Sequence, residues 1–492
     1  MRRRAWLLAC AAALGGCAVG PDFRRPDAPA LERYTREPLP GGTAAADAAT
    51  GGAQRFLQGG EVRADWWTLF GSRELNALVE SALANNPGVL SAQAALRKAQ
   101  ALARAQEGRL FPVVTAGYAR TRAKDSDALG SVLAQPPAGP YTLHTAQVAV
   151  GYVPDVFGGL QRQAESARAQ AEAQRFVLEA TYLTLTTNVV AAAVQEASLR
   201  AQLAAARDVV RANARSLEIL RRQFDAGQVA GLDVRAQEAA LAQSEQAVPP
   251  LQRQLEQVHD LIAALCGRFP SDAGPTLELS ALGLPQELPV SVPSKLVEQR
   301  PDVRAAESLL HAASADVGAA TANLLPQFSI TAARGGAATA FGQMLAGGNP
   351  FWSVAGGVAQ TLFAGGTLRA QKRAAEAAYD QAAADYRAAV IAAVQNVADV
   401  LYALQADADA LAAAARSERA ARSTLDVVQR QLEVGQVNVL ALLNAQQAHQ
   451  QALAALAQAR AARLADTAAL FQALGGGWWN RTGGAPAAPA KE

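Results

Sequence analysis

Side chains that could carry out chemistry are few in this sequence of 492 residues, and they lie far apart. None of the four histidines has a cysteine or carboxylate at the spacing of a metal-binding motif. These are His144, His259, His311 and His449. The glycine-rich stretches GGNP and AGGT lack the lysine of a phosphate-binding loop. The sequence therefore indicates neither an enzyme active site nor a metal site.

The residue best placed for a covalent role is Cys17, which follows a stretch typical of a secretory signal. Residues 2–4 are arginines, residues 6–14 are mostly apolar, and two glycines precede the cysteine. The apolar run is too short to span a membrane. The letters LGGC are similar to a bacterial lipobox, whose cysteine becomes the lipid-bearing first residue of the mature chain. We therefore predict a signal peptide over 1–16 and a covalent lipid on Cys17, with no other cofactor.

Charge and composition narrow the possible partners. The net charge is only +2 and no long basic run occurs, so the chain is not expected to bind nucleic acid. Half of the residues are hydrophobic, but only 5% are aromatic.

The chain contains two copies of one unit. Residues 85–112 align with 299–326 without a gap, and RRQFDAGQV at 221–229 aligns with QRQLEVGQV at 429–437. Outside the signal peptide, we predict five parts: a lipidated extended segment 17–71, a first repeat 72–267, an equatorial linker 268–292, a second repeat 293–476 and a C-terminal tail 477–492.

Long helices must dominate each repeat. Apolar residues recur every seven positions, as in a coiled coil, and no proline interrupts 159–226 or 366–434. Helices of that length would run for about 100 Å. Gly227 and Gly435 fit the left-handed position that ends a helix, and a second apolar-periodic helix follows each. The sequence of each repeat therefore predicts a helical hairpin with a tight tip.

Two β-hairpins are predicted between the helices. Their strands are rich in β-branched and aromatic residues and are expected at 113–124, 145–153, 328–334 and 351–363. An open sheet edge cannot lie in lipid, and bacterial barrels start at about eight strands. Several copies must therefore pool their strands if these enter a membrane. Three copies would give about twelve strands, although the sequence alone does not fix that number.

Four stretches of the sequence resemble the outer-membrane efflux proteins of the TolC family, specifically the NodT-type lipoproteins of resistance-nodulation-division (RND) pumps. They are CAVGPDFRRP, WWTLFGSRELNALVESALANNP, LVEQRPDVRAAE with ADVGAATANLLP, and the two tips. The resemblance implies a mainly α protomer with membrane β-strands. It also implies a homotrimer in which a 12-stranded β-barrel continues into a periplasmic α-barrel. A mixed belt would be drawn from 268–292 and the terminal segments.

The function implied by this resemblance is a passive exit duct for small molecules such as drugs. It would lie in the outer membrane of a Gram-negative bacterium and work with a periplasmic adaptor and an inner-membrane RND pump. Ala18, rather than aspartate, follows Cys17, which favours the outer membrane. A type I secretion duct and a metal-ion efflux duct remain alternatives. A coiled-coil lipoprotein scaffold would explain the heptads and Cys17 but not the repeated strand pairs.

The resemblance also implies roles for the tips, where family members close the duct and dock their adaptor. The implied contact residues are Arg222, Gly227, Val229, Leu232, Gly435, Val437 and Leu440. Asp233 and Asn444 are the gate candidates. Asp233 matches an acidic position that helps some members stay shut, whereas Asn444 takes the place of an acidic residue. The alternative is that Asp233 is a solvated carboxylate that favours the first turn of a helix.

Overall fold

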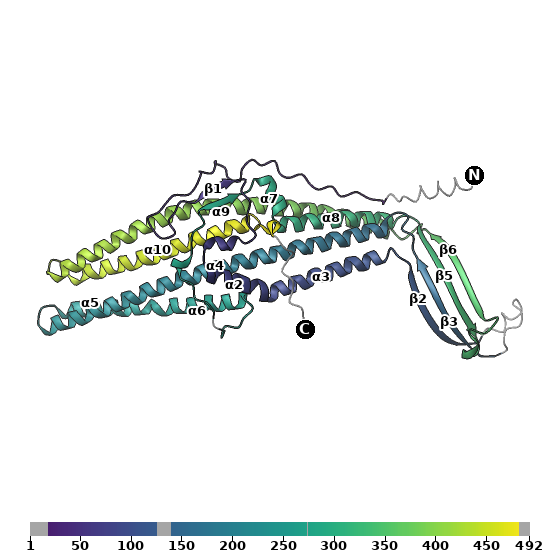
Figure 1. Ribbon diagram of the computed structural model, residues 1–492, viewed down its shortest axis with the longest axis horizontal. Helices are drawn as coiled ribbons and strands as arrows, with labels where there is room; N and C mark the ends of the chain where they lie inside the picture. The colour runs from purple at the N-terminus through teal and green to yellow at the C-terminus, as the bar shows by residue number, and fades with distance from the viewer. Residues whose placement is uncertain (1–17, 125–138, 273, 482–492) are drawn as a thin grey trace. The chain divides into compact units, whose positions relative to one another are not determined.

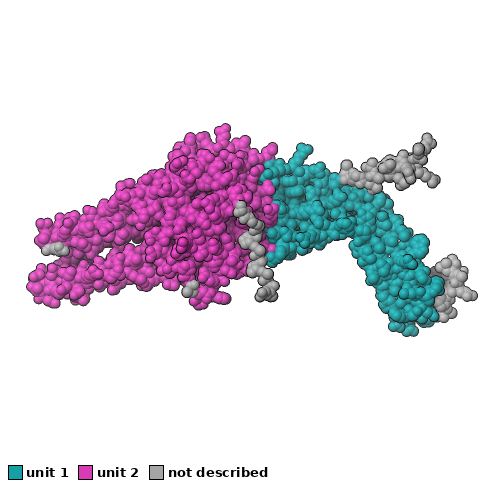
Figure 2. Space-filling model, in the orientation of Figure 1, with its two compact units in different colours: residues 1–26, 96–174, 306–386 teal, residues 27–95, 175–305, 387–492 magenta. Residues whose placement is uncertain are grey.

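The computed structural model describes residues 18–124, 139–272 and 274–481, so the predicted signal peptide, Cys17 and most of the C-terminal tail lie outside it. The chain divides into two compact units (Figure 2). Unit 1 comprises 1–26, 96–174 and 306–386, and unit 2 comprises 27–95, 175–305 and 387–492.

Unit 1 contains a four-stranded antiparallel sheet in the order β2-β3-β5-β6 (Figure 1). Its strands are β2 (Val113–Ala123), β3 (Tyr141–Tyr152), β5 (Gln327–Ala338) and β6 (Pro350–Ala359), and the short helix η4 (Phe341–Gln343) lies in the β5–β6 connection. The two predicted hairpins are therefore present, and β3 and β5 join them. Both β2 and β6 are left as open edges of the sheet.

The register of the sheet separates two faces of different chemistry, because directly paired residues point to the same side. One row across the sheet consists of Val114, Val150, Ala332 and Val354. The next row, on the opposite face, consists of Thr115, Ala149, Ala333 and Ser353. The face of Val114 is mostly apolar, although Arg120 and Arg334 also lie on it, and the opposite face is mostly small and polar, an alternation typical of a membrane barrel with an aqueous lumen.

The predicted strand limits were wrong at several ends. β3 begins at Tyr141 rather than residue 145, and β5 continues to Ala338 because the glycine-containing RGGAA segment pairs with β3 and β6. β6 stops at Ala359 rather than residue 363. Gly365 and Gly366 follow with positive φ and turn the chain toward the next helix.

Four helices have residues in both units: α3 (Pro87–Gly108), α4 (Gly159–Asp225), α8 (Pro301–Ala322) and α9 (Thr367–Glu433). The two long helices, α4 and α9, contain 67 residues each. Uninterrupted helices of this length agree with the heptad pattern and the absence of proline.

The hairpin tips lie in unit 2, where the two repeats differ. In the second, α9 is followed by one continuous helix, α10 (Val439–Ala473). In the first, the returning helix is divided into α5 (Gly231–Gln246) and α6 (Val248–Leu265). The apolar periodicity of the sequence predicts one helix here, which is wrong. The division arises at Pro249 and Pro250, which lack backbone N–H donors and fit only the first turn of a new helix.

A belt in unit 2 joins a strand from the N-terminal part of the chain to the linker between the repeats. β1 (Arg55–Gln58) pairs in parallel with β4 (Glu287–Val290). The surrounding short elements are η1 (Trp66–Phe70), α2 (Arg73–Asn85), η3 (Leu279–Ala281), α7 (Pro293–Gln299) and η5 (Trp478–Asn480). Trp66 is buried and stacks on Phe471 with 5.3 Å between ring centroids. Trp66 therefore helps to pack the belt.

Arg463 of α10 holds the stretch 43–52 against the belt. Its side chain is fully buried, and its guanidinium donates hydrogen bonds to Thr43 Oγ1 at 2.9 Å and to the Gly52 carbonyl at 2.8 Å. Asp407 of α9 is a nearby carboxylate that offsets this buried charge. Burial, together with a hydrogen bond shared with the Asp466 carboxyl, raises the pKa of Asp407 to about 7.

Candidate functional site

The described chain begins one residue after Cys17, and residues 18–26 are part of unit 1. We call these residues the N-terminal segment. The Val19 N–H donates a hydrogen bond to the Phe157 carbonyl at 3.0 Å, in the connection between β3 and α4. The segment therefore runs past the start of α4, directly beyond the end of a membrane-type strand.

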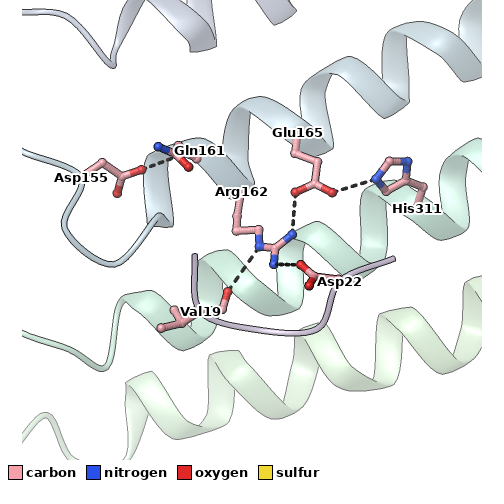
Figure 3. Close-up of polar contacts among 7 residues, drawn as sticks. All are labelled: Val19, Asp22, Asp155, Gln161, Arg162, Glu165 and His311. Carbon is pink, nitrogen blue, oxygen red and sulfur yellow. Dashed lines mark hydrogen bonds and ion pairs between the residues drawn. The ribbon is translucent and has the colours of Figure 1, made fainter. Parts of the chain in front are cut away.

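Arg162, in the first turns of α4, is at the centre of the contact (Figure 3). Its side chain is only 6% exposed. The guanidinium donates to Asp22 Oδ1 at 2.6 Å and to Glu165 Oε2 at 2.8 Å, while its Nε donates to the Val19 carbonyl at 3.3 Å. Charge-assisted hydrogen bonds of this kind offset the cost of removing a guanidinium from water.

His311 connects α8 to the same cluster. Its Nε2 lies 2.8 Å from the second Glu165 oxygen, and its ring stacks on Phe23 with 4.4 Å between centroids. Burial disfavours the charged form of Glu165, but the hydrogen bonds from His311 and Arg162 outweigh it. The pKa of Glu165 therefore lies below its ordinary value, and this carboxylate stays ionised between its two basic partners.

Two local features position these side chains. Asp155 caps the start of α4 by accepting the backbone N–H groups of Leu160 and Gln161 at 3.0 and 2.7 Å. Gly20 has φ of +100°, and a Cβ added there would lie 2.3 Å from the Cα of Gly318. Only glycine fits a position with that backbone conformation and that close an approach.

Sequence reasoning predicted an extended segment after Cys17 but missed its contact with Arg162. The residues of the contact are about 140 positions apart in sequence, and neither Asp22 nor Arg162 belongs to a motif. The isolated Gly20 beside Pro21 was the one local signal of an unusual backbone.

At the tips, the two repeats end their long helices in the same way. Gly227 and Gly435 have φ of +71° and +73°. The following N–H groups, of Gln228 and Gln436, each donate to a carbonyl five residues earlier at 2.8 Å. This is the hydrogen bonding of a glycine-terminated helix, as the aligned glycines predicted.

The remaining tip residues have different surroundings. Leu232 and Leu440 are 78% and 60% exposed, so a large apolar side chain projects from each tip. The Asp233 carboxylate accepts the Ala230 N–H at 3.2 Å and so caps α5. Leu440 and Asn444 line a groove between α5 and α10, but Asp233 does not line it.

Comparison with known proteins agrees with this architecture. The family model described as "Outer membrane efflux protein" matches residues 78–268 and 292–476. The toluene efflux pump outer membrane protein TtgC of Pseudomonas putida is 28% identical over 96% of this chain and 94% of its own. The pyoverdine export outer membrane protein OpmQ of the same species is 29% identical over 84% of this chain and 88% of its own.

A solved structure of the outer-membrane channel OprN is 29% identical and has a TM-score of 0.83. The match covers 94% of this chain and all of the OprN chain. The predicted fold class, long helical hairpins combined with two β-hairpins, is confirmed. The chain belongs to the outer membrane efflux protein family, and it is a passive channel of the Gram-negative outer membrane rather than an enzyme.

Proposed function

We propose that this protein is the exit duct of a tripartite RND-type pump and conducts small molecules from the periplasm to the exterior. The observation that carries the proposal is the four-stranded sheet, with one mostly apolar face, one mostly small and polar face, and two open edges. Such a sheet can serve in lipid only as part of a closed barrel. The long helical hairpins then form the periplasmic portion of the duct.

Closure of the barrel requires further copies of the chain, and we propose a homotrimer. The open edges of β2 and β6 would pair between neighbouring protomers. Helix α9 supports this assembly, because an 18-residue apolar window within it is only 22% buried in the single chain. Neighbouring protomers would cover this surface.

The tips are the proposed site of contact with a periplasmic adaptor. Exposed apolar side chains at Leu232 and Leu440 would pack against the partner, and the glycine-terminated turns would allow close approach. Arg222, Val229 and Val437 flank these positions. Asp233 and Asn444 remain the proposed gate residues.

Lipid on Cys17 is the second part of the proposal. The LGGC sequence motivates it, and the N-terminal segment would bring the modified cysteine to the membrane surface. The proposed domain division is unchanged: a lipidated segment 17–71, two repeats at 72–267 and 293–476, the linker 268–292 between them and the tail 477–492.

The transported compound is set mostly by the pump rather than the duct. Relatives of nearly equal identity to this chain are named for toluene efflux and for pyoverdine export, two chemically unlike cargoes. The duct lining therefore carries little information about the cargo.

Complementation tests the proposed function. The chain is expressed with its adaptor and pump in a host that lacks its own efflux ducts, and drug resistance is measured. We expect a several-fold rise in resistance that depends on all three proteins. The double variant Leu232→Asp with Leu440→Asp should lose this gain while forming the same amount of trimer. Resistance that is unchanged by the duct would contradict the proposal.

A further inference from the structure

We propose that the N-terminal segment is latched to the protein by a dock around Arg162, and that this latch determines where the acyl chains of Cys17 enter the membrane. The dock consists of Arg162 and Glu165 on α4 and Glu307, His311 and Gly318 on α8. The statement about acyl chains rests on the proposed lipidation of Cys17, whereas the latch itself depends only on contacts within the protein.

Contacts at four of its residues hold the segment over its length. Val19 is bound through its backbone at both the N–H and the carbonyl, and Asp22 pairs with Arg162. Phe23 stacks on His311, and Arg25 forms an ion pair with Glu307 at 3.0 Å. Both α4 and α8, one helix from each repeat, take part. A segment that served only as a tether would need none of these contacts.

In both ion pairs between the segment and the dock, the helix residue is buried and the segment residue is exposed. The Arg162 and Glu307 side chains are 6% and 11% exposed, whereas the Asp22 side chain is 90% exposed. The buried partners thus belong to the helices, and the segment supplies an exposed carboxylate and a partly exposed arginine. Release of the segment returns Asp22 to water and uncovers Arg162, which keeps Glu165 as an acceptor, while Glu165 retains His311. The segment can therefore leave without unfolding α4 or α8.

The dock fixes the position of the lipid. Ala18 lies against Gly158, whose bare Cα faces it so closely that a Cβ there would be 2.5 Å from the Ala18 Cβ. Cys17 is one residue away, a span of about 3.6 Å at most. Its acyl chains must then enter the bilayer beside the connection between β3 and α4. If residues 18–26 were an unattached tether, the acyl chains could enter the bilayer anywhere within about 30 Å of residue 26.

Limited trypsin digestion of the lipidated trimer in detergent tests the latch. Trypsin can cut after Arg24, but not readily after Arg25 because Pro26 follows, so loss of the peptide 17–24 by mass spectrometry reports release of the segment. We expect Arg162→Gln to accelerate this cleavage several-fold. Arg168→Gln is the matched control: Arg168 lies on the same helix, pairs with Glu107 and should leave the rate unchanged.

A second variant acts on the segment itself. Gly20→Val places a side chain against the Cα of Gly318 and should release the segment as Arg162→Gln does, without altering the helices. Equal cleavage rates for wild type and Gly20→Val, with both as intact trimers, would overturn the latch.

An unlipidated chain, secreted through an ordinary cleavable signal peptide in place of residues 1–17, separates the latch from lipidation. If protein contacts hold the segment, its cleavage after Arg24 should be as slow as in wild type. Cleavage as fast as in Arg162→Gln would mean that the lipid alone holds the segment, and the latch would be rejected. Absence of an acyl group on wild-type Cys17 would refute the lipid proposal, whereas the protection measurement would still decide the latch.

Discussion

At the scale of single residues, two buried arginines hold the N-terminal part of the chain in different ways. Arg162 bonds two carboxylates and one carbonyl in unit 1. Arg463 in unit 2 donates hydrogen bonds mainly to neutral oxygen atoms. Asp407, on the neighbouring helix α9, interacts electrostatically with the positive charge of Arg463. Such residues tie the chain to one arrangement, because a guanidinium left buried without its acceptors is strongly unfavourable.

The Asp407 carboxyl should make stability depend on pH. Burial and the Asp466 carboxyl raise its pKa to about 7, well above the ordinary value. Its contribution to stability is therefore fully present below the unfolded-state pKa of about 4 and is lost as pH rises through about 7. We expect Asp407→Asn to reduce the fall in melting temperature between pH 5 and pH 8, measured for the trimer by thermal denaturation.

The control for this prediction is Asp409→Asn, because Asp409 is exposed on the same helix. It should retain the wild-type pH dependence. If Asp407→Asn and wild type lose the same number of degrees over this pH range, the carboxyl pair does not titrate there.

Cys17 carries the second residue-scale prediction. Cys17→Ser removes the thiol that would receive the lipid, so we expect no acylation and slower removal of the signal peptide. Intact-mass spectrometry of the membrane-extracted chain measures both. An unmodified wild-type chain that begins at another residue would rule out the lipid anchor.

At the scale of elements, Asp233 has two possible roles that a pair of variants separates. Its carboxylate accepts the N–H of the N-cap residue Ala230 from the third position of α5, and a negative charge in this first turn is worth about 0.3–1 kcal/mol. Asp233→Asn retains the capping ability but removes the charge, whereas Asp233→Ala removes both. If the charge helps to close the duct, both variants should raise single-channel conductance without lowering the amount of trimer.

Other outcomes assign Asp233 differently. A higher single-channel conductance in Asp233→Ala alone would mean that the cap, rather than the charge, holds the tip in place. Two channels indistinguishable from wild type would leave Asp233 with only its helix-end role.

The helices and tips were predictable because their signals are local and repeated. Heptads, long runs without proline and the aligned Gly227 and Gly435 indicate rods that end in tight turns. The division of the first returning helix was missed although Pro249 and Pro250 are adjacent, because the apolar periodicity continues through them. Strand ends were missed because pairing with a neighbouring strand, rather than intrinsic preference, extends β5 through Gly335 and Gly336.

The N-terminal dock lay beyond sequence reasoning for a different reason. The dock and the segment that it holds come from three parts of the chain, and no regular spacing relates Asp22, Arg162 and His311. Their roles arise only when α4 and α8 are folded. By contrast, Cys17 could be proposed from a short motif alone.

At the scale of the whole molecule, the single chain has surfaces that need further copies of the chain to cover them. Its sheet has two open edges, and α9 exposes apolar side chains such as Ile391, which is 66% exposed. Both features are costly in an isolated chain and are relieved when copies assemble around a common axis. The proposed trimer therefore follows from the same features that make the duct.

Conductance in planar bilayers tests the central claim most directly. Purified wild-type protein, checked by native mass spectrometry to contain three chains, is added to one side of a bilayer under voltage. A duct built from pooled strands should produce discrete, uniform current steps as single trimers insert. A protein that binds the bilayer but never produces such steps, in wild type and in both Asp233 variants, would contradict the account and favour a coiled-coil scaffold.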